Sequence, residues 1–162
     1  MTIKEGDKIP EATLMHMTAD GGPGQITTAE LFDGKKVALF SVPGAFTPTC
    51  SAQHLPGFIE QADAIKGKGV DTIACMAVND AFVMDAWGKD RGVGDKIEML
   101  ADGNGDFTRA LGLELDATGF GLGQRGQRFS LIADDGVVTK LNVEEGGAFE
   151  VSKAEVLLQQ LG

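Results

Sequence analysis

Apolar residues in this chain form short continuous runs that alternate with longer stretches of helical periodicity. A run such as residues 37–42 (VALFSV), bounded by polar and turn-forming residues, is typical of a strand buried on both faces of a parallel sheet. Such runs predict strands at residues 12–17, 37–43, 70–78 and 97–100. Periodic stretches predict helices at residues 48–66 and 81–91, the second capped by Asn79 or Asp80. The alternation of strands and helices indicates an α/β sheet built from βαβ units.

Shorter patterns mark both ends of the chain. The sequence TTAE at residues 27–30 is a capping-box pattern, which predicts the start of a short helix. The turn sequence DDG at residues 134–136 separates two apolar stretches, and it predicts a β-hairpin between residues 127–133 and 137–143. Ser152-x-x-Glu155 has the spacing of a second capping box, so we expect it to open a final helix that reaches Leu161.

Length and charge limit the classes of protein to consider. A chain of 162 residues buries about 68–70% of its extended surface on folding, which suits one domain spanning residues 1–162. The net charge of −10 repels phosphate backbones and anionic lipids, so we expect neither nucleic-acid nor membrane binding. The sequence shows neither a secretory signal nor an apolar run of about 20 residues. We therefore expect a cytoplasmic protein.

Two cysteines, Cys50 and Cys75, are the candidates for chemistry. They are too few for a disulfide scaffold, and their separation excludes a C-x-x-C pair. Cys50 falls in the first turn of the helix expected after the strand at 37–43, with Thr47 as its N-cap and Pro48 as its first residue. Unpaired N–H groups and the helix dipole favour a thiolate at this position. Cys50 is therefore the predicted nucleophile.

The residues around Cys50 resemble a known active-site signature. The spacing Pro43-x-x-x-Thr47-x-x-Cys50, within residues 42–58 (VPGAFTPTCSAQHLPGF), resembles the signature of the peroxiredoxins. Residues 77–87 (AVNDAFVMDAW) and 128–143 (RFSLIADDGVVTKLNV) resemble the type II, or peroxiredoxin-five-like, branch. The resemblance implies a thioredoxin fold with an N-terminal extension and an inserted helical segment. It also implies a thiol-dependent peroxidase that reduces hydrogen peroxide and alkyl hydroperoxides.

The same resemblance assigns roles to individual residues. Cys50 attacks the peroxide and becomes a sulfenic acid, while the Thr47 hydroxyl contacts the sulfur and the peroxide. Arg128 stands where this family carries an arginine that contacts the sulfur and the departing oxygens, and a guanidinium is always protonated. Pro43 shields the sulfur. The expected lining of the substrate pocket includes Pro43, Gly44, Phe46 and His54, with Phe46 covering one side of the thiol.

Other interpretations of these residues stay open. His54 lies four residues after Cys50 and would share its helix face. It is either a packing histidine or the base of a Cys-His hydrolase. Arg125 is either a solvated arginine, part of the pocket mouth or the partner of a carboxylate. A third possibility is a peroxide-sensing thioredoxin-fold redox protein or chaperone.

The recycling of the oxidised thiol is the least determined step. Cys75 matches the position of a second cysteine in plant-like members of the branch, but its apolar strand suits an inert core residue equally well. Related animal enzymes carry a resolving cysteine in the segment that corresponds to residues 149–152, where this chain has none. We expect glutathione/glutaredoxin or thioredoxin as the reductant. The resemblance further implies a homodimer, and we expect no metal, haem or flavin cofactor.

Two further motifs fail on context. Residues 121–126 have the G-x-G-x-x-G spacing of a dinucleotide-binding loop, but they precede a predicted strand, and no helix pattern follows them. Residues 102–106 begin like a calcium loop, but Phe107 replaces the required glycine and Leu113 the required glutamate. We interpret this second segment as a turn.

Overall fold

The computed structural model describes residues 2–162. The strands of its main sheet are β1 (Thr13–Met17), β2 (Pro23–Thr27), β3 (Lys36–Ser41), β4 (Thr72–Ala77), β5 (Glu98–Ala101), β8 (Phe129–Asp134) and β9 (Val137–Val143). The α-helices are α1 (Thr28–Phe32), α2 (Leu55–Gly67), α3 (Ala81–Arg91), α4 (Asp106–Leu111) and α5 (Ala154–Gln160). A π-helical turn η1 (Cys50–His54) precedes α2, and a 3-10 turn η2 (Thr118–Phe120) connects the small strands β6 (Glu114–Ala117) and β7 (Gly123–Gly126).

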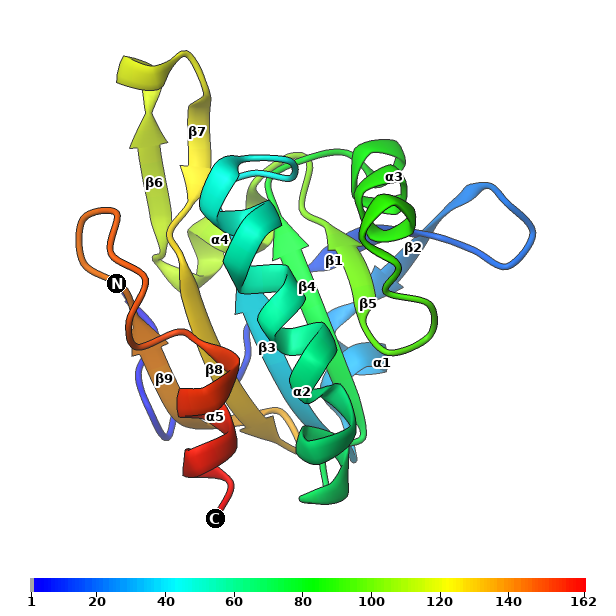
Figure 1. Cartoon of the computed structure of the whole chain (residues 1–162), viewed down its shortest axis with the longest axis vertical. Helices are drawn as coiled ribbons and strands as arrows, with labels where there is room; N and C mark the ends of the chain where they lie inside the picture. Colours follow the sequence, from blue (N-terminus) through cyan, green and yellow to red (C-terminus); the bar gives the residue numbers. More distant parts are fainter. Residues whose placement is uncertain (1) are drawn as a thin grey trace.

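The main sheet is mixed and has the order β2-β1-β5-β4-β3-β8-β9 (Figure 1). The central strands β5, β4 and β3 are parallel, whereas the outer strands pair antiparallel with their neighbours. Helices α2, α3 and α5 cover one face of the sheet, and α1 and α4 lie on the other. The hairpin β6–β7 projects beyond the end of the sheet (Figure 1).

The central strands divide their side chains between two cores. In β3, Ala38 and Phe40 join the core under α2, α3 and α5, while Val37 and Leu39 join the core on the opposite face. Phe40 pairs in register with Cys75 of the neighbouring strand β4. Because side chains alternate between the faces of a strand, Cys75 lies on the face covered by α2. This two-sided burial explains why both strands have continuous apolar sequences.

Most of the predicted elements are confirmed, with small differences at their ends. The capping box at residues 27–30 is present, because the Thr27 side chain accepts from the Glu30 N–H and the Glu30 carboxylate accepts from the Thr27 N–H. Asp80, rather than Asn79, caps α3. The predicted hairpin is β8–β9, and its turn places Asp135 and Gly136 at positive φ angles of 49° and 78°.

One prediction about local structure is wrong, and three short elements were not predicted. The hydroxyl of Ser152 does not cap α5; it donates to the Glu144 carboxylate at 2.6 Å, and Lys153 stands at the N-cap instead. Residues 102–106 contain the predicted turn, in which the Gly105 N–H donates to the Asp102 carbonyl at 2.8 Å, and this turn leads into α4, which has no counterpart among the predicted elements. The strands β6 and β7 were also missed. Each of these elements is only four to six residues long, too short for a recognisable period.

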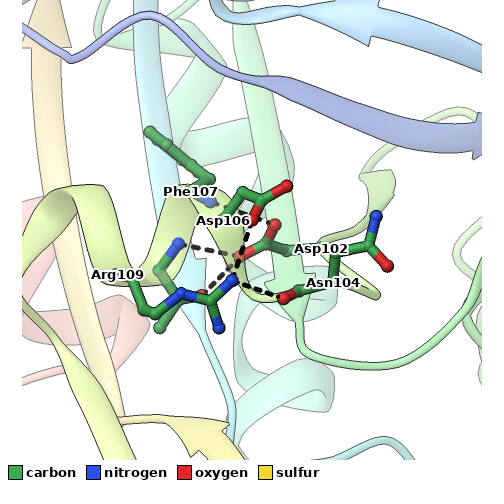
Figure 2. A network of polar contacts seen from close by, with 6 residues as sticks. Asp102, Asn104, Asp106, Phe107 and Arg109 are labelled. Carbon is green, nitrogen blue, oxygen red and sulfur yellow. Dashed lines mark hydrogen bonds and ion pairs between the residues drawn. The ribbon is translucent and has the colours of Figure 1, made fainter.

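Asp102 holds the start of α4 from three residues before its N-cap. Its buried carboxylate accepts hydrogen bonds from the N–H groups of Phe107 and Thr108 and from the Thr108 hydroxyl (Figure 2). Arg109 closes the outer side of the turn through Asp106 and the Asn104 carbonyl. Asp102 therefore satisfies N–H groups that the first turn of a helix leaves unpaired.

No helix in residues 2–162 is long and apolar enough to span a membrane.

Candidate active site

The loop between β3 and η1 carries the first candidate residues, and three contacts hold it. The Ala45 N–H donates to the Asn79 side chain at 2.9 Å, which ties the loop to the end of β4. The Arg125 guanidinium donates to the Pro43 carbonyl at 3.3 Å. The Thr47 hydroxyl donates to the Gly44 carbonyl at 2.7 Å. The loop is therefore held by Asn79 and Arg125 from elsewhere in the chain and by one hydrogen bond within the loop itself.

Gly44 and Phe46 of this loop have unusual local geometry. A Cβ atom at Gly44 would lie 2.9 Å from an Arg125 nitrogen, so a larger residue at this position would require the guanidinium to shift. Phe46 has a φ angle of 65°, which is costly for a residue with a bulky side chain. Its ring is 51% exposed and lies near the Trp87 ring, with 6.4 Å between centroids. Strained residues of this kind cluster at functional sites.

Cys50 begins the π-helical turn η1. The Leu55 N–H donates to the Cys50 carbonyl five residues back, which is the π-helical pattern. The prediction of Thr47 as the N-cap is half right. The Thr47 carbonyl accepts from the Ser51 N–H, as an N-cap carbonyl does, but the Thr47 hydroxyl donates to the Gly44 carbonyl of the loop. Across residues 2–162, no helix N–H donates to that hydroxyl. The periodic pattern at 48–66 carried no signal for the change from α to π geometry.

Arg128 reaches Cys50 from the strand next to β3. It immediately precedes β8, which pairs with the end of β3 where the loop begins. One terminal nitrogen of its guanidinium lies 3.1 Å from the Cys50 sulfur, and the other donates to His54 Nδ1 at 2.8 Å. Cys50 has no exposed surface. The structure therefore places a permanent positive charge against a buried sulfur.

His54 is fully buried and uncharged at neutral pH. Burial, and secondarily the positive charge of Arg128, lower the pKa of His54 to about 3. Its Nε2 atom lies 3.0 Å from the Ser152 carbonyl, which can only accept, so Nε2 carries the hydrogen. Its Nδ1 lone pair accepts from Arg128. Because both ring nitrogens are already paired, this arrangement speaks against His54 as the base of a hydrolase.

Aromatic rings surround the His54 side chain. It contacts Phe40 and Phe58 of the core and makes an edge-on contact with Phe149, with ring centroids 5.1 Å apart. Phe149 also lies under the Arg128 guanidinium at 5.8 Å. Phe149 therefore packs against both the imidazole and the guanidinium, and its contact with the guanidinium is a cation–π interaction.

Cys75 is a free, fully buried thiol in β4, on the same side of the sheet as Cys50. Burial raises the pKa of the Cys75 thiol well above its ordinary value, and the nearby Cys50 adds to the rise. A cysteine in this environment is protonated and inert unless the surrounding structure opens.

Several residues that support the site had no functional assignment from the sequence. Trp87, in α3, donates to the Ser51 hydroxyl at 2.9 Å and so holds the residue next to Cys50. Asn79 anchors the loop, and Ser152 orients His54. Only Asn79 carried a usable signal, since it follows a buried strand near the edge where the loops of a parallel sheet gather. Arg125, left open by the sequence, pairs with backbone carbonyls rather than with a carboxylate.

Comparisons with known proteins identify relatives of this chain. The Redoxin family model matches residues 4–158. The chain is 57% identical to rice Peroxiredoxin-2E-2, chloroplastic, over 99% of its own length and 73% of that protein. It is 50% identical to Peroxiredoxin-2B from Arabidopsis thaliana, over 98% of each chain.

A solved structure shows the same fold. Reduced Prx3 from Vibrio vulnificus in complex with hydrogen peroxide superimposes with a TM-score of 0.95 at 55% identity, covering 99% of this chain and 100% of the other. The predicted thioredoxin-like α/β fold is therefore confirmed. Peroxiredoxins are thiol-dependent peroxidases. The family model and the full-length relatives together show that this chain is a member of the peroxiredoxin family.

Proposed function

We propose that Cys50 is the nucleophile of this peroxidase, in a single domain formed by residues 1–162. The observation that carries the proposal is the 3.1 Å contact between the Cys50 sulfur and Arg128. The guanidinium donates without ever accepting, so it stabilises a thiolate better than a thiol. Its second nitrogen is held by the neutral His54, which fixes the direction of the donor that faces the sulfur.

The reaction follows from this arrangement. The Cys50 thiolate attacks one peroxide oxygen, an S–O bond forms as the O–O bond breaks, and the electron pair leaves on the second oxygen. That oxygen takes a proton from solvent and departs as water or an alcohol, while Cys50 remains as a sulfenic acid. Arg128 stabilises the charge that develops on the leaving oxygen. The Thr47 hydroxyl, on the same loop, is our candidate for the second contact to the peroxide.

Peroxide reaches the sulfur through the outer side of the loop. Cys50 has no exposed surface, so we expect the loop to shift before peroxide reaches the sulfur. The strained, half-exposed Phe46 is the residue that we expect to move first, because no large burial energy holds its ring. Pro43 and Gly44 complete the lining on this side. The Vibrio vulnificus relative was solved with hydrogen peroxide, which supports a small peroxide as substrate.

An external thiol is the reductant that we propose, either glutathione with glutaredoxin or thioredoxin. Cys75 is buried within β4, and a disulfide to Cys50 would require their Cα atoms to come within about 7 Å in a suitable geometry. It would also require the raised-pKa thiol to ionise. Resolution by an external thiol needs only access to Cys50.

A single set of variants tests the function. We expect wild-type protein to consume hydrogen peroxide in the presence of a thiol donor, and mass spectrometry to find one added oxygen on Cys50. Cys50→Ser should abolish both. Cys75→Ser, the matched control, should retain most of the turnover. Loss of turnover in Cys75→Ser would contradict external resolution, and fast oxidation without turnover would favour a peroxide sensor.

We also propose a cytoplasmic homodimer that packs near the active-site loops. Phe46, Phe82 and Phe120 are large apolar side chains that are 51%, 61% and 86% exposed, and exposed aromatic residues are enriched at protein interfaces. Sedimentation of the wild type and of Phe120→Ser tests the dimer. A wild-type protein that stays monomeric at all concentrations would contradict it.

A further inference from the structure

A buried carboxylate lies outside the active site and has no catalytic role so far. Glu144 directly follows β9, is only 7% exposed, and takes part in none of the ion pairs found in residues 2–162. Burying a carboxylate without an opposite charge is costly unless hydrogen bonds replace its water. One oxygen of Glu144 accepts three such bonds, all from the segment at residues 150–152.

These bonds fix the segment whose Ser152 carbonyl orients His54. The Glu150 and Ser152 N–H groups donate to Glu144 at 2.8 Å each, and the Ser152 hydroxyl donates at 2.6 Å. Burial by itself raises the pKa of Glu144, but hydrogen bonds from Ser152 and the neighbouring backbone outweigh it and hold the pKa below its ordinary value. Glu144 is therefore ionised at neutral pH and binds this segment tightly. The Ser152 carbonyl is left in position to accept the His54 Nε2–H at 3.0 Å.

The Ser152 carbonyl and the Arg128 donor select the same tautomer of His54, and the carbonyl fixes the orientation of the ring. With its hydrogen on Nε2, the ring presents a lone pair at Nδ1, which is the only form that can accept from Arg128. Without the Ser152 carbonyl, the buried Nε2–H would lose its acceptor, and the ring would no longer be held in the orientation that presents Nδ1 to the arginine. The guanidinium would then lose the contact that holds it beside the Cys50 sulfur.

We propose that Glu144 is a positioning residue of the peroxidase, acting through Ser152 and His54 to hold Arg128 against Cys50. The chain of contacts runs from the carboxylate through the backbone of Ser152 and the His54 imidazole to the guanidinium, and every hydrogen bond in it is 3.1 Å or shorter. Glu144 touches neither the sulfur nor the substrate. This inference rests on the proposed role of Cys50 and Arg128.

Loss of the Glu144 contacts should slow the reaction of Cys50 with peroxide and should have little effect on its reaction with other electrophiles. Oriented N–H donors lower a barrier only where charge develops on the reacting oxygens. Alkylation by iodoacetamide develops no such charge. A loss of Arg128 alignment should therefore slow reaction with peroxide much more than alkylation, when each rate is measured on its plateau with pH.

The test measures both reactions in Glu144→Gln. Single-turnover oxidation, followed by Trp87 fluorescence, should slow by about tenfold, the equivalent of one weakened charge-assisted hydrogen bond. The limiting alkylation rate should stay within about twofold of wild type. If Glu144 acts through His54, the same substitution should change the peroxide rate by less than about twofold in a His54→Ala background.

Asp102→Asn is the matched control. Asp102 is also a buried carboxylate that accepts three hydrogen bonds, but its partners lie at the start of α4 (Figure 2). This variant should lose stability and keep the wild-type peroxide rate. A peroxide rate that falls as far in Asp102→Asn as in Glu144→Gln would show a general effect of destabilisation and overturn the inference.

If Glu144→Gln does not fold, Ser152→Ala is the variant that tests the inference. It removes one of the three donors to Glu144 and should slow the peroxide step by about threefold. A peroxide rate within twofold of wild type in the folded variant, or a tenfold effect of Glu144→Gln that persists without His54, would overturn the inference. Wild-type protein that fails to react with peroxide would instead refute the proposed function itself.

Discussion

Acid should destabilise the folded protein through His54 before the carboxylates titrate. The pKa of this side chain falls from its ordinary value of 6.5 to about 3 on folding, because the ring is buried and lies beside Arg128. Between these two pH values the unfolded chain binds a proton that the folded protein does not. The contribution of His54 to the free energy of unfolding is therefore fully present above pH 6.5 and is lost progressively as the pH falls toward 3.

The structure sets the size of this loss. Each pH unit below the unfolded pKa costs about 1.4 kcal/mol for one group, so lowering the pH from 7.5 to 5.0 should remove about 2 kcal/mol. The pKa of Glu144 is lowered on folding, so its contribution to the free energy of unfolding is lost only below about pH 4.5 and changes little in this range. The matched variant is His54→Gln, which keeps one donor and one acceptor but has no group that titrates there.

Urea unfolding at pH 7.5 and 5.0 measures the effect. Trp87 is the single tryptophan of the chain and is fully buried, so its fluorescence reports unfolding directly. The wild type should lose about 2 kcal/mol more than His54→Gln between the two pH values, at equal protein concentration. The comparison subtracts every other titrating group. Parallel losses in the two proteins would show that His54 is not held neutral in the folded state.

Three further outcomes are expected. Arg128→Lys keeps the charge but loses the two-nitrogen fork, so single-turnover oxidation of Cys50 by peroxide should slow by about 10²–10³-fold; a loss below tenfold would contradict its proposed role. Trp87→Phe leaves the buried Ser51 hydroxyl without its donor and should cost about 1–3 kcal/mol in urea unfolding followed by circular dichroism. Thr27→Ala removes the capping box of α1 and should cost about 1 kcal/mol by the same measurement, whereas an unchanged midpoint would show that tertiary packing alone holds this helix.

Local patterns in the sequence were sufficient wherever the energetics are local. The continuous apolar runs of β3 and β4 identified strands buried on both faces, and the turn residues at 134–136 identified the β8–β9 hairpin. The cap of α3 and the capping box of α1 follow from side chains that bond N–H groups three residues away. The same kind of pattern failed at Ser152, because a distant carboxylate competes successfully for its hydroxyl.

The sequence by itself determined the fold class, the family resemblance and the candidacy of Cys50 and Arg128. Only the tertiary structure decided how these residues meet, since Arg128 lies 78 positions from Cys50. It also decided the charge and tautomer of His54, because both depend on burial and on a carbonyl 98 positions away. Desolvation and hydrogen bonding between distant segments arise only once the sheet has brought them together, so no local pattern records them.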